Sequence, residues 1–404
     1  MKVLVVSQYY WPEHFQVTDE CKELVARGHE VTVLTGLPNY PSGRIPKEYR
    51  RGQNRRQEKA GVRIMRAGLI ERGSNPVQLA LNYHSFAFSA SRLVSSLDDD
   101  FDVVYVPEVS PVTMIEPAVK YKKMYGVPLL VYCCDLWPES LKNMIGNRFG
   151  FILNVYQSIS KRLYSSADIL AVQSPAFSDY LAKIHQIPRE KMIFFPQFAD
   201  DSYLKEDFNE EHEGVNFLVM GNIGKAQDIP VILNAASLIS DELKFVIHFV
   251  GEGSFLESAR RLAAKLKLDK RVVFHGRRPY EEMGLYYGVT DACILALNGE
   301  SWIGTTIPSR LQGYMAAGKP VLAAVNGGSA MVLKESGCGR SVRAGDSKGL
   351  ACLIQEFVCK PDSYSEFGEK GRQYFTKHFT KKRHMDDLEK MLLDLKERKK
   401  NVCR

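Results

Sequence analysis

The sequence lacks the cysteine spacings that mark a metal site or a disulfide framework. Its eight cysteines form no C-x-x-C pair, and none has a histidine at metal-ligand spacing. Most of them lie in apolar runs, so we expect reduced residues of the protein core. They are Cys21, Cys133, Cys134, Cys293, Cys338, Cys352, Cys359 and Cys403.

Long apolar runs are missing as well. The longest stretch without Asp, Glu, Lys or Arg is Gly73–Ser91, and its Asn, Gln, His and Ser residues make it too polar to span a bilayer. Met1 and Lys2 lead directly into the strand-like run Val3–Val6, without the apolar stretch and cleavage site of a signal peptide. We therefore expect a cytoplasmic protein.

The chain does have the length and pattern of a two-domain α/β protein. Its 404 residues exceed what one hydrophobic core usually supports. Short β-branched runs alternate with helical patterns, which is typical of βαβ units and parallel sheets. The predicted strands are Val3–Val6, Val31–Leu34, Val103–Val106, Leu129–Tyr132, Ile169–Val172, Ile193–Phe195, Asn216–Met220, Phe245–Val250, Val272–His275, Ala292–Leu295, Val321–Ala323 and Arg340–Val342.

The domain boundaries follow from composition. The polar, acidic stretch Asp200–Gly214 separates the two strand series and is typical of an interdomain linker. We therefore expect two Rossmann-like domains at 1–197 and 215–375, joined by a linker at 198–214. The tail, 376–404, is helical in pattern and is expected to pack back on the first domain.

Basic charge is concentrated in one segment. From Arg44 to Arg72, ten basic residues stand against three acidic ones, an excess that equals the net charge of +7 of the whole chain. Such a field suits an anionic membrane surface or a phosphate-bearing substrate, although a solvated loop or a nucleic-acid site is also compatible with it. The next stretch, Gly73–Ser91, has apolar residues at helical spacing, for which we favour packing on the core over contact with a membrane. These residues are Leu79, Tyr83, Phe86 and Ala90.

Glycine-rich turns follow three strands of the second half. Ligands of open α/β sheets bind beyond the carboxyl ends of strands, and glycines let backbone amides approach an anion there. A lysine in the first turn would meet the anion's charge. A tight turn without a ligand remains the alternative for each. The candidate residues are Asn222, Gly224, Lys225, Gln227, Gly251, Gly253 and Arg277.

A fourth loop, 301–310, carries hydroxyl groups and an arginine immediately before a predicted helix. The N-terminus of a helix favours a pyrophosphate, because its free amides and its dipole both attract negative charge. A loop that only packs against the helix is the alternative. The candidate donor contacts are Gly304, Thr305, Thr306, Ser309 and Arg310.

The order of these turns and the segment Tyr314–Val321 (YMAAGKPV) resemble the retaining family 4 glycosyltransferases of the GT-B fold. The resemblance covers nearly the whole chain. Within this family, the sequence resembles the subgroup that builds surface polysaccharide, including fucosyl and N-acetyl-fucosaminyl transferases. It implies an α/β fold of two Rossmann-like domains whose parallel sheets face a central cleft. The segments that carry it are Ser7–Glu13 (SQYYWPE), Arg27–Gly36 (RGHEVTVLTG), Pro38–Gly43 (PNYPSG), Asp135–Ser140 (DLWPES) and Gly221–Gln227 (GNIGKAQ).

The sequence departs from the family at several site positions. The E-x(7)-E signature would place glutamates at about Thr305 and Gly313, and neither residue is acidic. The arginine and lysine that grip the diphosphate in the family map to Asn222 and Gln227, which leaves Lys225 and Arg310 as the expected cations. The histidine that precedes the first-domain aspartate, Asp135, is replaced by Cys134.

The expected chemistry needs neither a metal nor a cofactor. Cleavage of a nucleotide-sugar leaves negative charge on the diphosphate, which preorganised amides, a helix dipole and cations can stabilise. We interpret Asp98–Asp100 as a polar turn rather than a metal-binding D-x-D pair. We name no enzyme nucleophile.

The first domain supplies the expected acceptor site. The loop after its first strand offers Trp11, Glu13 and His14 as acceptor contacts. Glu13, His14, Asp135 and Glu139 are candidates for orienting or deprotonating an acceptor hydroxyl, and a structural role is the alternative for each.

The resemblance implies a hexosyl or N-acetylhexosaminyl transferase that uses a nucleotide-sugar, with UDP favoured. The expected acceptor is a saccharide linked to polyprenyl diphosphate, in O-antigen or capsule synthesis. We expect peripheral contact with the inner face of the membrane through Arg44–Arg72 and Gly73–Ser91, and no nucleic acid. A non-hydrolysing sugar-nucleotide epimerase and a non-catalytic partner in a polysaccharide assembly complex remain the competing functions.

Overall fold

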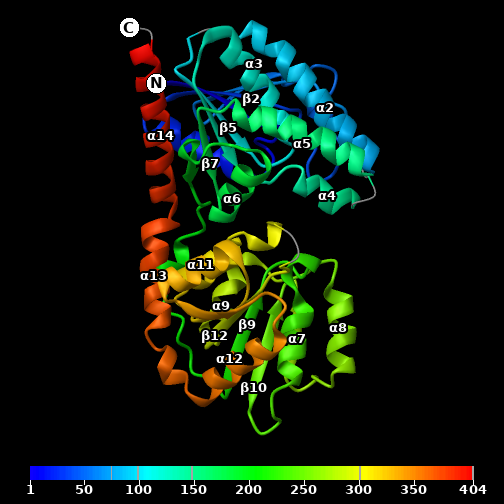
Figure 1. The fold of residues 1–404 in the computed structure, drawn as a ribbon, viewed down its shortest axis with the longest axis vertical. Coiled ribbons are helices and arrows are strands. Elements are labelled where there is room, and N and C mark those ends of the chain that lie inside the picture. The colour runs from blue at the N-terminus through cyan, green and yellow to red at the C-terminus, as the bar shows by residue number, and fades with distance from the viewer. Residues whose placement is uncertain (74, 98–99, 147–148, 300–301, 403–404) are drawn as a thin grey trace. The chain divides into compact units, whose positions relative to one another are not determined.

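The computed structural model describes the whole chain except residues 74, 98–99, 147–148, 300–301 and 403–404. It divides into two compact units, each described here by itself (Figure 1). The first unit comprises Met1–Gln173, Phe177–Phe195 and Met385–Arg404, and the second comprises Ser174–Ala176 and Pro196–His384. Two of the aspartates in the predicted polar turn, Asp98 and Asp99, lie outside the described residues.

The first unit is built on an eight-stranded sheet. The strand order is β3-β4-β2-β1-β5-β6-β7-β8, and every neighbouring pair is parallel except β3 with β4. The strands are β1 (Lys2–Val6), β2 (Glu30–Thr35), β3 (Arg56–Lys59), β4 (Val62–Arg66), β5 (Val103–Glu108), β6 (Leu129–Cys133), β7 (Ile169–Val172) and β8 (Met192–Phe194). The helices are α1 (Gln16–Ala26), α2 (Pro76–Leu93), α3 (Glu116–Tyr125), α4 (Glu139–Ile145), α5 (Gly150–Ser165) and α6 (Pro175–Ile184).

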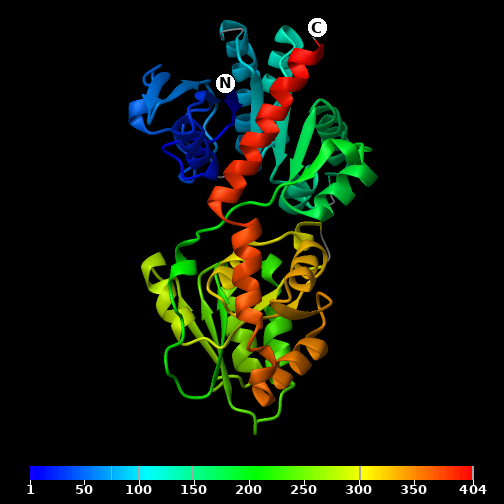
Figure 2. The ribbon, with the colours of Figure 1, turned by 90° about the vertical axis from the view of Figure 1, so that its left-hand side faces the viewer.

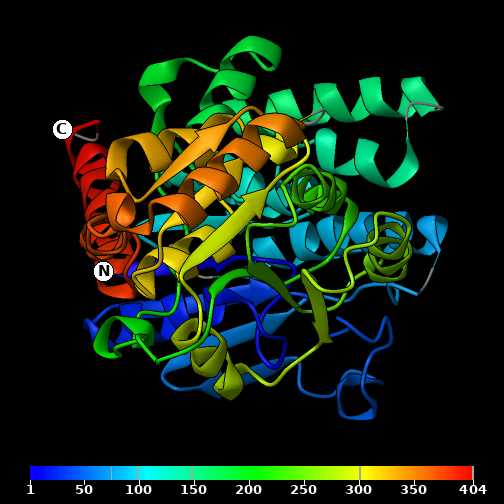
Figure 3. The same ribbon diagram turned by 90° about the horizontal axis from the view of Figure 1, so that it is seen from below.

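The second unit is built on a six-stranded parallel sheet with helices on both faces (Figure 3). The strand order is β11-β10-β9-β12-β13-β14. The strands are β9 (Val215–Met220), β10 (Phe245–Val250), β11 (Val272–Gly276), β12 (Ala292–Ala296), β13 (Val321–Ala324) and β14 (Gly339–Val342). The helices are α7 (Ile229–Ser237), α8 (Leu256–Lys265), α9 (Met283–Gly288), α10 (Ser309–Ala316), α11 (Gly327–Ser336), α12 (Ser347–Cys359) and α13 (Phe367–His378).

The predicted fold class, two Rossmann-like parallel-sheet domains, is confirmed. Each predicted strand corresponds to a strand of the structure. The signal is clearest for β1 and β6, whose residues are almost all apolar and buried. The hairpin β3–β4 was not predicted. Its strand β3 reads Arg-Gln-Glu-Lys and is mostly exposed, so no apolar pattern identifies it. The basic segment Arg44–Arg72 is therefore not simply a loop.

Other expectations need correction. Cys352 and Cys359 are exposed on α12 rather than buried, whereas the remaining described cysteines are buried and free. The segment expected to be a linker contributes Tyr203 and Phe208 to the core of the second unit.

In the stretch Gly73–Ser91 the expected packing on the core is confirmed, since three residues of the predicted stripe are buried. These are Tyr83, Phe86 and Ala90.

The C-terminal tail forms two helices instead of one. α13 lies in the second unit, and α14 (Lys381–Val402) lies mostly in the first unit, as the red helix of Figure 2. The apolar residues of α14 recur every three or four positions and are buried in the same core as α1 and the first sheet. They are Met385, Leu388, Met391, Leu392 and Leu395.

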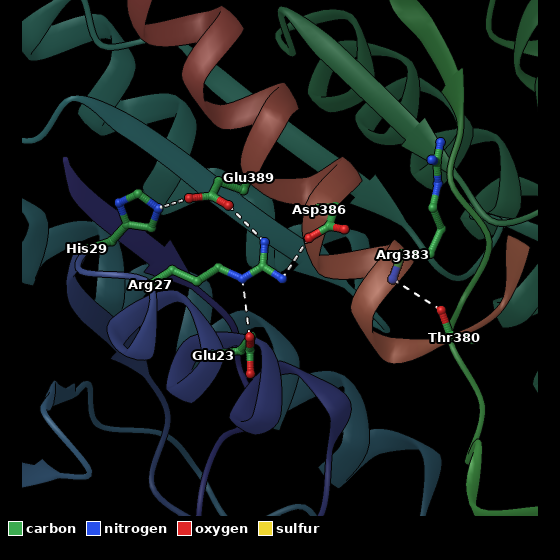
Figure 4. A network of polar contacts seen from close by, with 7 residues as sticks. All are labelled: Glu23, Arg27, His29, Thr380, Arg383, Asp386 and Glu389. Carbon is green, nitrogen blue, oxygen red and sulfur yellow. Dashed lines mark hydrogen bonds and ion pairs between the residues drawn. The ribbon is translucent and has the colours of Figure 1, made fainter. Parts of the chain in front are cut away.

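An ion-pair network fixes the start of α14 on α1 (Figure 4). The Arg27 guanidinium lies 2.8 Å from Glu389 and 2.9 Å from Asp386, and it also pairs with Glu23 of its own helix at 3.2 Å. His29 contacts the other oxygen of Glu389 at 2.8 Å. The hydrogen bond from Arg27 and, to a smaller extent, the one from His29 hold the pKa of Glu389 below its usual range. A single arginine therefore joins three carboxylates at the junction of the two helices.

Among the described residues, no helix combines the length and the hydropathy that crossing a bilayer requires.

Packing of α14 is testable with neighbouring leucines. Leu392 is fully buried, whereas Leu393 is 41% exposed. We expect Leu392→Ala to lower the free energy of unfolding by about 2–4 kcal/mol, because it leaves a cavity in the first core. Leu393→Ala is the matched control and should change it by less than about 0.5 kcal/mol. Urea denaturation measures both, and equal effects would contradict the described packing.

Candidate active site

The loops after β9, β10 and β11 lie together at the carboxyl edge of the second sheet. The backbone N–H of Gly221 donates to Val250 O at 2.8 Å, and that of Gly251 donates to Gly276 O at 2.8 Å. The N–H of Ile223 donates to Glu252 O, also at 2.8 Å. These bonds join three loops into one surface, as expected where parallel strands end side by side.

Two of the predicted glycines permit this close packing. A Cβ on Gly251 would lie 1.9 Å from Gly221 O, and a Cβ on Gly253 would lie 2.3 Å from Ile223 O. Gly251 also has a φ of 150°, which side chains disfavour. Both glycines are therefore needed for the approach of one loop to the next, and any contact with a ligand comes in addition.

A cavity of about 320 Å³ opens at these loops. Arg277 and Arg278 line it from the loop after β11, and Glu252 lines it from the loop after β10. Both arginines are exposed. Its other lining residues are Met220, Gly221, Val250, Gly251 and Met283.

The loop after β9 presents a lysine beside ordered amides. The Gln227 side chain accepts a hydrogen bond from the Gly224 backbone N–H at 3.0 Å and contacts the Asn222 amide at 3.4 Å. Lys225 begins the short helix Lys225–Gln227 and is exposed. Asn222 and Gln227 therefore shape the loop, and Lys225 is an exposed cation on it.

Arg310 reaches this loop from α10. Its Nη2 donates to Asn222 O at 2.8 Å and would lie 3.5 Å from a Cβ on Gly221. Burial lowers the pKa of its guanidinium, yet an arginine remains charged at neutral pH. The two expected cations, Lys225 and Arg310, thus belong to one loop cluster.

The loop before α10 is tied to the same cluster. A Cβ on Gly304 would lie 1.6 Å from Asn298 O, and the Asn298 N–H donates to Ala226 O at 2.9 Å. Thr305 Oγ1 donates to Trp302 O at 2.5 Å, so this hydroxyl is used within the loop. Thr306 accepts a hydrogen bond through its carbonyl, from Ser329 at 2.7 Å, and Ser309 is exposed in the first turn of α10. Thr306 and Ser309 retain hydroxyls for which the structure assigns no partner among the described residues.

In the first unit, Glu13 has a structural role. It is 6% exposed, and its Oε1 accepts hydrogen bonds from the backbone N–H groups of Asn39 and Tyr40, each at 2.7 Å. Burial raises its pKa, while these bonds act in the opposite direction. The carboxylate joins the loop after β1 to the loop after β2.

Asp135 has the environment of an acid–base group. Its Oδ2 accepts from Ser110 Oγ at 2.7 Å, and Ser110 Oγ accepts from the Trp137 indole at 3.0 Å. Burial raises the pKa of Asp135 from 3.8 to about 6. Its neighbour Glu108 is fully buried, and burial followed by repulsion from Asp135 raises the pKa of Glu108 well above the usual range. The two neighbouring carboxyls thus both have raised pKa values, Asp135 by burial and Glu108 by burial and by repulsion from Asp135.

Sequence reasoning missed Glu108 and Ser110. Ser110 adopts a φ of 134°, which is uncommon for a residue with a side chain and holds its hydroxyl between Asp135 and Trp137. Neither residue belongs to a recognisable motif, so only the strand order, which places β5 beside β6, identifies them.

The remaining candidates of the first unit are Glu139, His14 and Trp11. Glu139 accepts from Tyr180 OH at 3.3 Å and pairs with Lys142 of its own helix at 3.6 Å. His14 is exposed, and Trp11 is partly exposed with Lys59 over its ring at 5.4 Å.

An arginine surrounded by tyrosines was also missed. Arg72 Nη1 donates to Tyr9 OH at 2.6 Å, and its guanidinium lies 5.5 Å from the Tyr40 ring and 5.7 Å from the Tyr83 ring. Tyr83 in turn contacts Trp137 edge to face at 6.2 Å. A cation among aromatic rings, near Asp135, suits a sugar or a phosphate. In the sequence, Arg72 can be recognised only as one of the ten basic residues of the segment Arg44–Arg72.

No group of three or more His, Cys, Asp or Glu side chains that could hold a metal occurs within the described part of the chain.

Comparison with known proteins identifies both halves. Residues 15–197 match the family "Glycosyl transferase 4-like domain", and residues 201–374 match "Glycosyl transferases group 1". The chain carries two glycosyltransferase domains. Together the two matches include every strand of both sheets except β1, and every loop described above except the loop after β1.

Relatives of these glycosyltransferase domains support the assignment. The chain is 26% identical to the glycosyltransferase WbjE of Pseudomonas aeruginosa, over 73% of each chain. It is 22% identical to the colanic acid biosynthesis glycosyl transferase WcaI of Escherichia coli, over 79% of this chain and 82% of the relative. The second of these names assigns that relative to colanic acid biosynthesis.

Solved structures share the fold. Sucrose-phosphate synthase from Thermosynechococcus elongatus superposes with a TM-score of 0.72 at 16% identity, over 98% of each chain. HepE of Anabaena in complex with UDP superposes with a TM-score of 0.70 at 12% identity, over 98% of this chain and all (100%) of the other.

The burial of Asp135 predicts a pH-dependent change in stability. Folding costs free energy when this carboxyl is ionised, because its pKa is about 6 in the folded protein against 3.8 ordinarily. We expect Asp135→Asn to raise the free energy of unfolding at pH 7.5 by on the order of 2 kcal/mol. The gain should be lost as the pH falls from about 6 to about 3.8, since the native carboxyl is then neutral as well.

Urea denaturation at pH 7.5, 6.0 and 4.5 measures this gain. Asp394→Asn, at an exposed position of α14, is the control and should have little effect at any pH. A gain for Asp135→Asn that does not change with pH would contradict the raised pKa.

Proposed function

We propose that the two glycosyltransferase domains transfer a sugar, with retention of configuration, from a nucleotide diphosphate to a saccharide acceptor of surface polysaccharide. The observation that carries the proposal is the loop cluster of the second unit. The Nη2 atom of Arg310 on α10 lies 2.8 Å from Asn222 O. Asn222 belongs to the same loop as Lys225. A glycosyltransferase domain with a hydrogen-bonded cation, Arg310, and an exposed cation, Lys225, at this edge is suited to a diphosphate.

The two cations stabilise the leaving group in this proposal. The bond between the anomeric carbon and the diphosphate oxygen breaks, and the electron pair stays on the nucleoside diphosphate. Lys225, Arg310 and the amides of the loop before α10 offset the new negative charge, which is where fixed donors accelerate a reaction most. The proposal uses no metal.

The acceptor hydroxyl forms the new bond to the anomeric carbon and loses a proton. Asp135 is the group best suited to receive it, because a pKa of about 6 lies close to neutral pH. Glu13 is less suited, since its Oε1 accepts two backbone hydrogen bonds. Arg72 and the tyrosines around it are proposed to hold the acceptor.

We further propose UDP as the nucleotide and a lipid-linked saccharide as the acceptor. The complex of HepE with UDP supports UDP, although only the fold of that protein is shared. The relative named for colanic acid biosynthesis supports a polysaccharide acceptor. The basic segment Arg44–Arg72 and the neighbouring Gly73–Ser91 support contact with the membrane that holds such a lipid.

Nucleotide binding tests the proposal. We expect UDP, among UDP, GDP, ADP and dTDP, to raise the melting temperature, because a ligand that binds only the native state stabilises it. Lys225→Ala and Arg310→Ala should each reduce the apparent affinity by about tenfold or more, since each removes a charge-assisted contact. Lys265→Ala, an exposed lysine of α8, is the control. The absence of a shift with every nucleotide would favour a non-catalytic partner.

A further inference from the structure

α2 of the first unit has a second apolar stripe on its exposed side. Val77 is 70% exposed, Leu81 is 47% exposed and Phe88 is 65% exposed. With the exposed His84, they follow at intervals of four, three and four residues, so they lie along one side of the helix. The buried stripe, which includes Tyr83 and Phe86, already anchors the helix in the protein. The exposed stripe is therefore not needed for folding.

α5 continues this apolar surface beside α2. Its first two turns expose Phe151 at 81%, Ile152 at 41% and Val155 at 41%. A hydrogen bond of 2.9 Å between Tyr156 OH and His84 Nε2 joins the two helices, which are adjacent in Figure 1. We call the six exposed residues the α2–α5 face: Val77, Leu81, Phe88, Phe151, Ile152 and Val155.

The charges of these helices have one sign. Neither α2 nor α5 contains an Asp or a Glu. Arg92 follows Phe88 by one turn and lies 5.2 Å from its ring. Lys161 is exposed near the end of α5, whereas Arg162 is paired with Glu116 of α3. The cations of the face that have no ion pair among the described residues are therefore Arg92 at the end of α2 and Lys161 near the end of α5.

A cavity of about 420 Å³ adjoins the end of α2. Four arginines and no carboxylate line it. Arg66 is 3% exposed, whereas Arg56 and Arg92 are exposed and have no ion-pair partner among the described residues. The full lining is Arg55, Arg56, Met65, Arg66, Ala67, Gly68, Ser89, Arg92, Leu93 and Ser96. The guanidinium groups of Arg56 and Arg92 are suited to a phosphate, whereas that of Arg66 already donates to Gln57, Gly36 O and Trp11 O.

The opposite side of α2 contacts the candidate acceptor site. Asn82 accepts from the Gln8 side chain at 2.8 Å and donates to the Asn39 side chain at 3.1 Å. The next residue, Tyr83, lies under Arg72. One helix therefore has the acceptor site on its inner side and the apolar stripe on its outer side.

We infer that the α2–α5 face docks on an anionic lipid bilayer, with Phe88 and Phe151 among the acyl chains and the arginine cavity around a lipid phosphate. This combination matches a membrane interface, where an apolar layer lies directly beneath a negatively charged one. The inference rests on the proposed function, because it would bring a lipid-linked acceptor to the site on the inner side of α2.

Vesicle sedimentation of the full chain tests the inference. We expect binding to phosphatidylglycerol–phosphatidylethanolamine vesicles and at least about tenfold weaker binding to phosphatidylcholine vesicles. Phe88→Ser with Phe151→Ser should reduce the partition coefficient by about tenfold or more on anionic vesicles. Arg56→Ala with Arg92→Ala should reduce binding to anionic vesicles and leave the weak binding to neutral vesicles unchanged.

Matched controls come from the second unit. Leu238→Ser with Leu285→Ser removes leucines that are 54% and 61% exposed. Arg261→Ala with Lys265→Ala removes two exposed positive charges from α8. Both controls should bind vesicles like the wild type. All variants change exposed side chains, and unchanged melting temperatures would show that they are folded.

Three results would overturn the inference. They are a wild type that does not bind anionic vesicles, a Phe88→Ser and Phe151→Ser variant that binds them normally, and a wild-type dimer that this variant dissociates. The shift in melting temperature that UDP causes in the absence of lipid separates the docking inference from the transferase proposal. If the wild type binds UDP but no vesicles, only the docking inference fails; if it binds vesicles but no nucleotide, only the transferase proposal fails.

Discussion

Parallel strand pairing is the constraint on which the rest of the structure depends. In both units every strand except β3 runs in the same direction as its neighbours, so the loops after the strands emerge at one edge. The loops that bear Gly221, Gly251 and Gly276 meet through backbone hydrogen bonds for this reason. In the first unit the same geometry brings Ser110, after β5, to Asp135, after β6. Residues far apart in the chain thus form two chemically different surfaces.

Electrostatics distinguishes these two surfaces. The loop cluster of the second unit contains the cations Lys225 and Arg310, which suits the leaving diphosphate of the proposed reaction. The first unit contains Asp135, whose pKa burial raises to about 6, and a buried neighbour, Glu108, whose pKa burial also raises. The proposed sugar transfer requires a proton acceptor and a group that stabilises the charge of the leaving diphosphate, and the proposal assigns one of these functions to each unit.

Much of the fold follows from sequence, because apolar strands and glycine turns are local signals. Prediction from the sequence fails where the role of a residue depends on its neighbours in space. β3 is short and mostly charged, so no apolar pattern marks it. The break between α13 and α14 at Phe379 lies inside a continuous helical pattern, and that residue is buried in the second core.

The candidate site was predictable to a similar extent. The glycine turns, Lys225, Arg310 and Asp135 could be named as candidates from the sequence, because they lie in or next to loops that follow recognisable strands. Glu13 was identified by its place in a loop, but its bonds to Asn39 and Tyr40 show a structural role that position alone does not reveal. Arg72 was missed, because its significance comes from the rings of Tyr9, Tyr40 and Tyr83 around it.

The central claim is that the chain moves a sugar from a nucleotide to an acceptor. The direct measurement is NMR of the reaction of nucleotide-sugars with and without a lipid-linked saccharide, which reports nucleotide release and the configuration of the new anomeric carbon. The account predicts release that depends on the acceptor, together with a product that keeps the anomeric configuration of the donor. Conversion of the nucleotide-sugar to an epimer without any acceptor would contradict it.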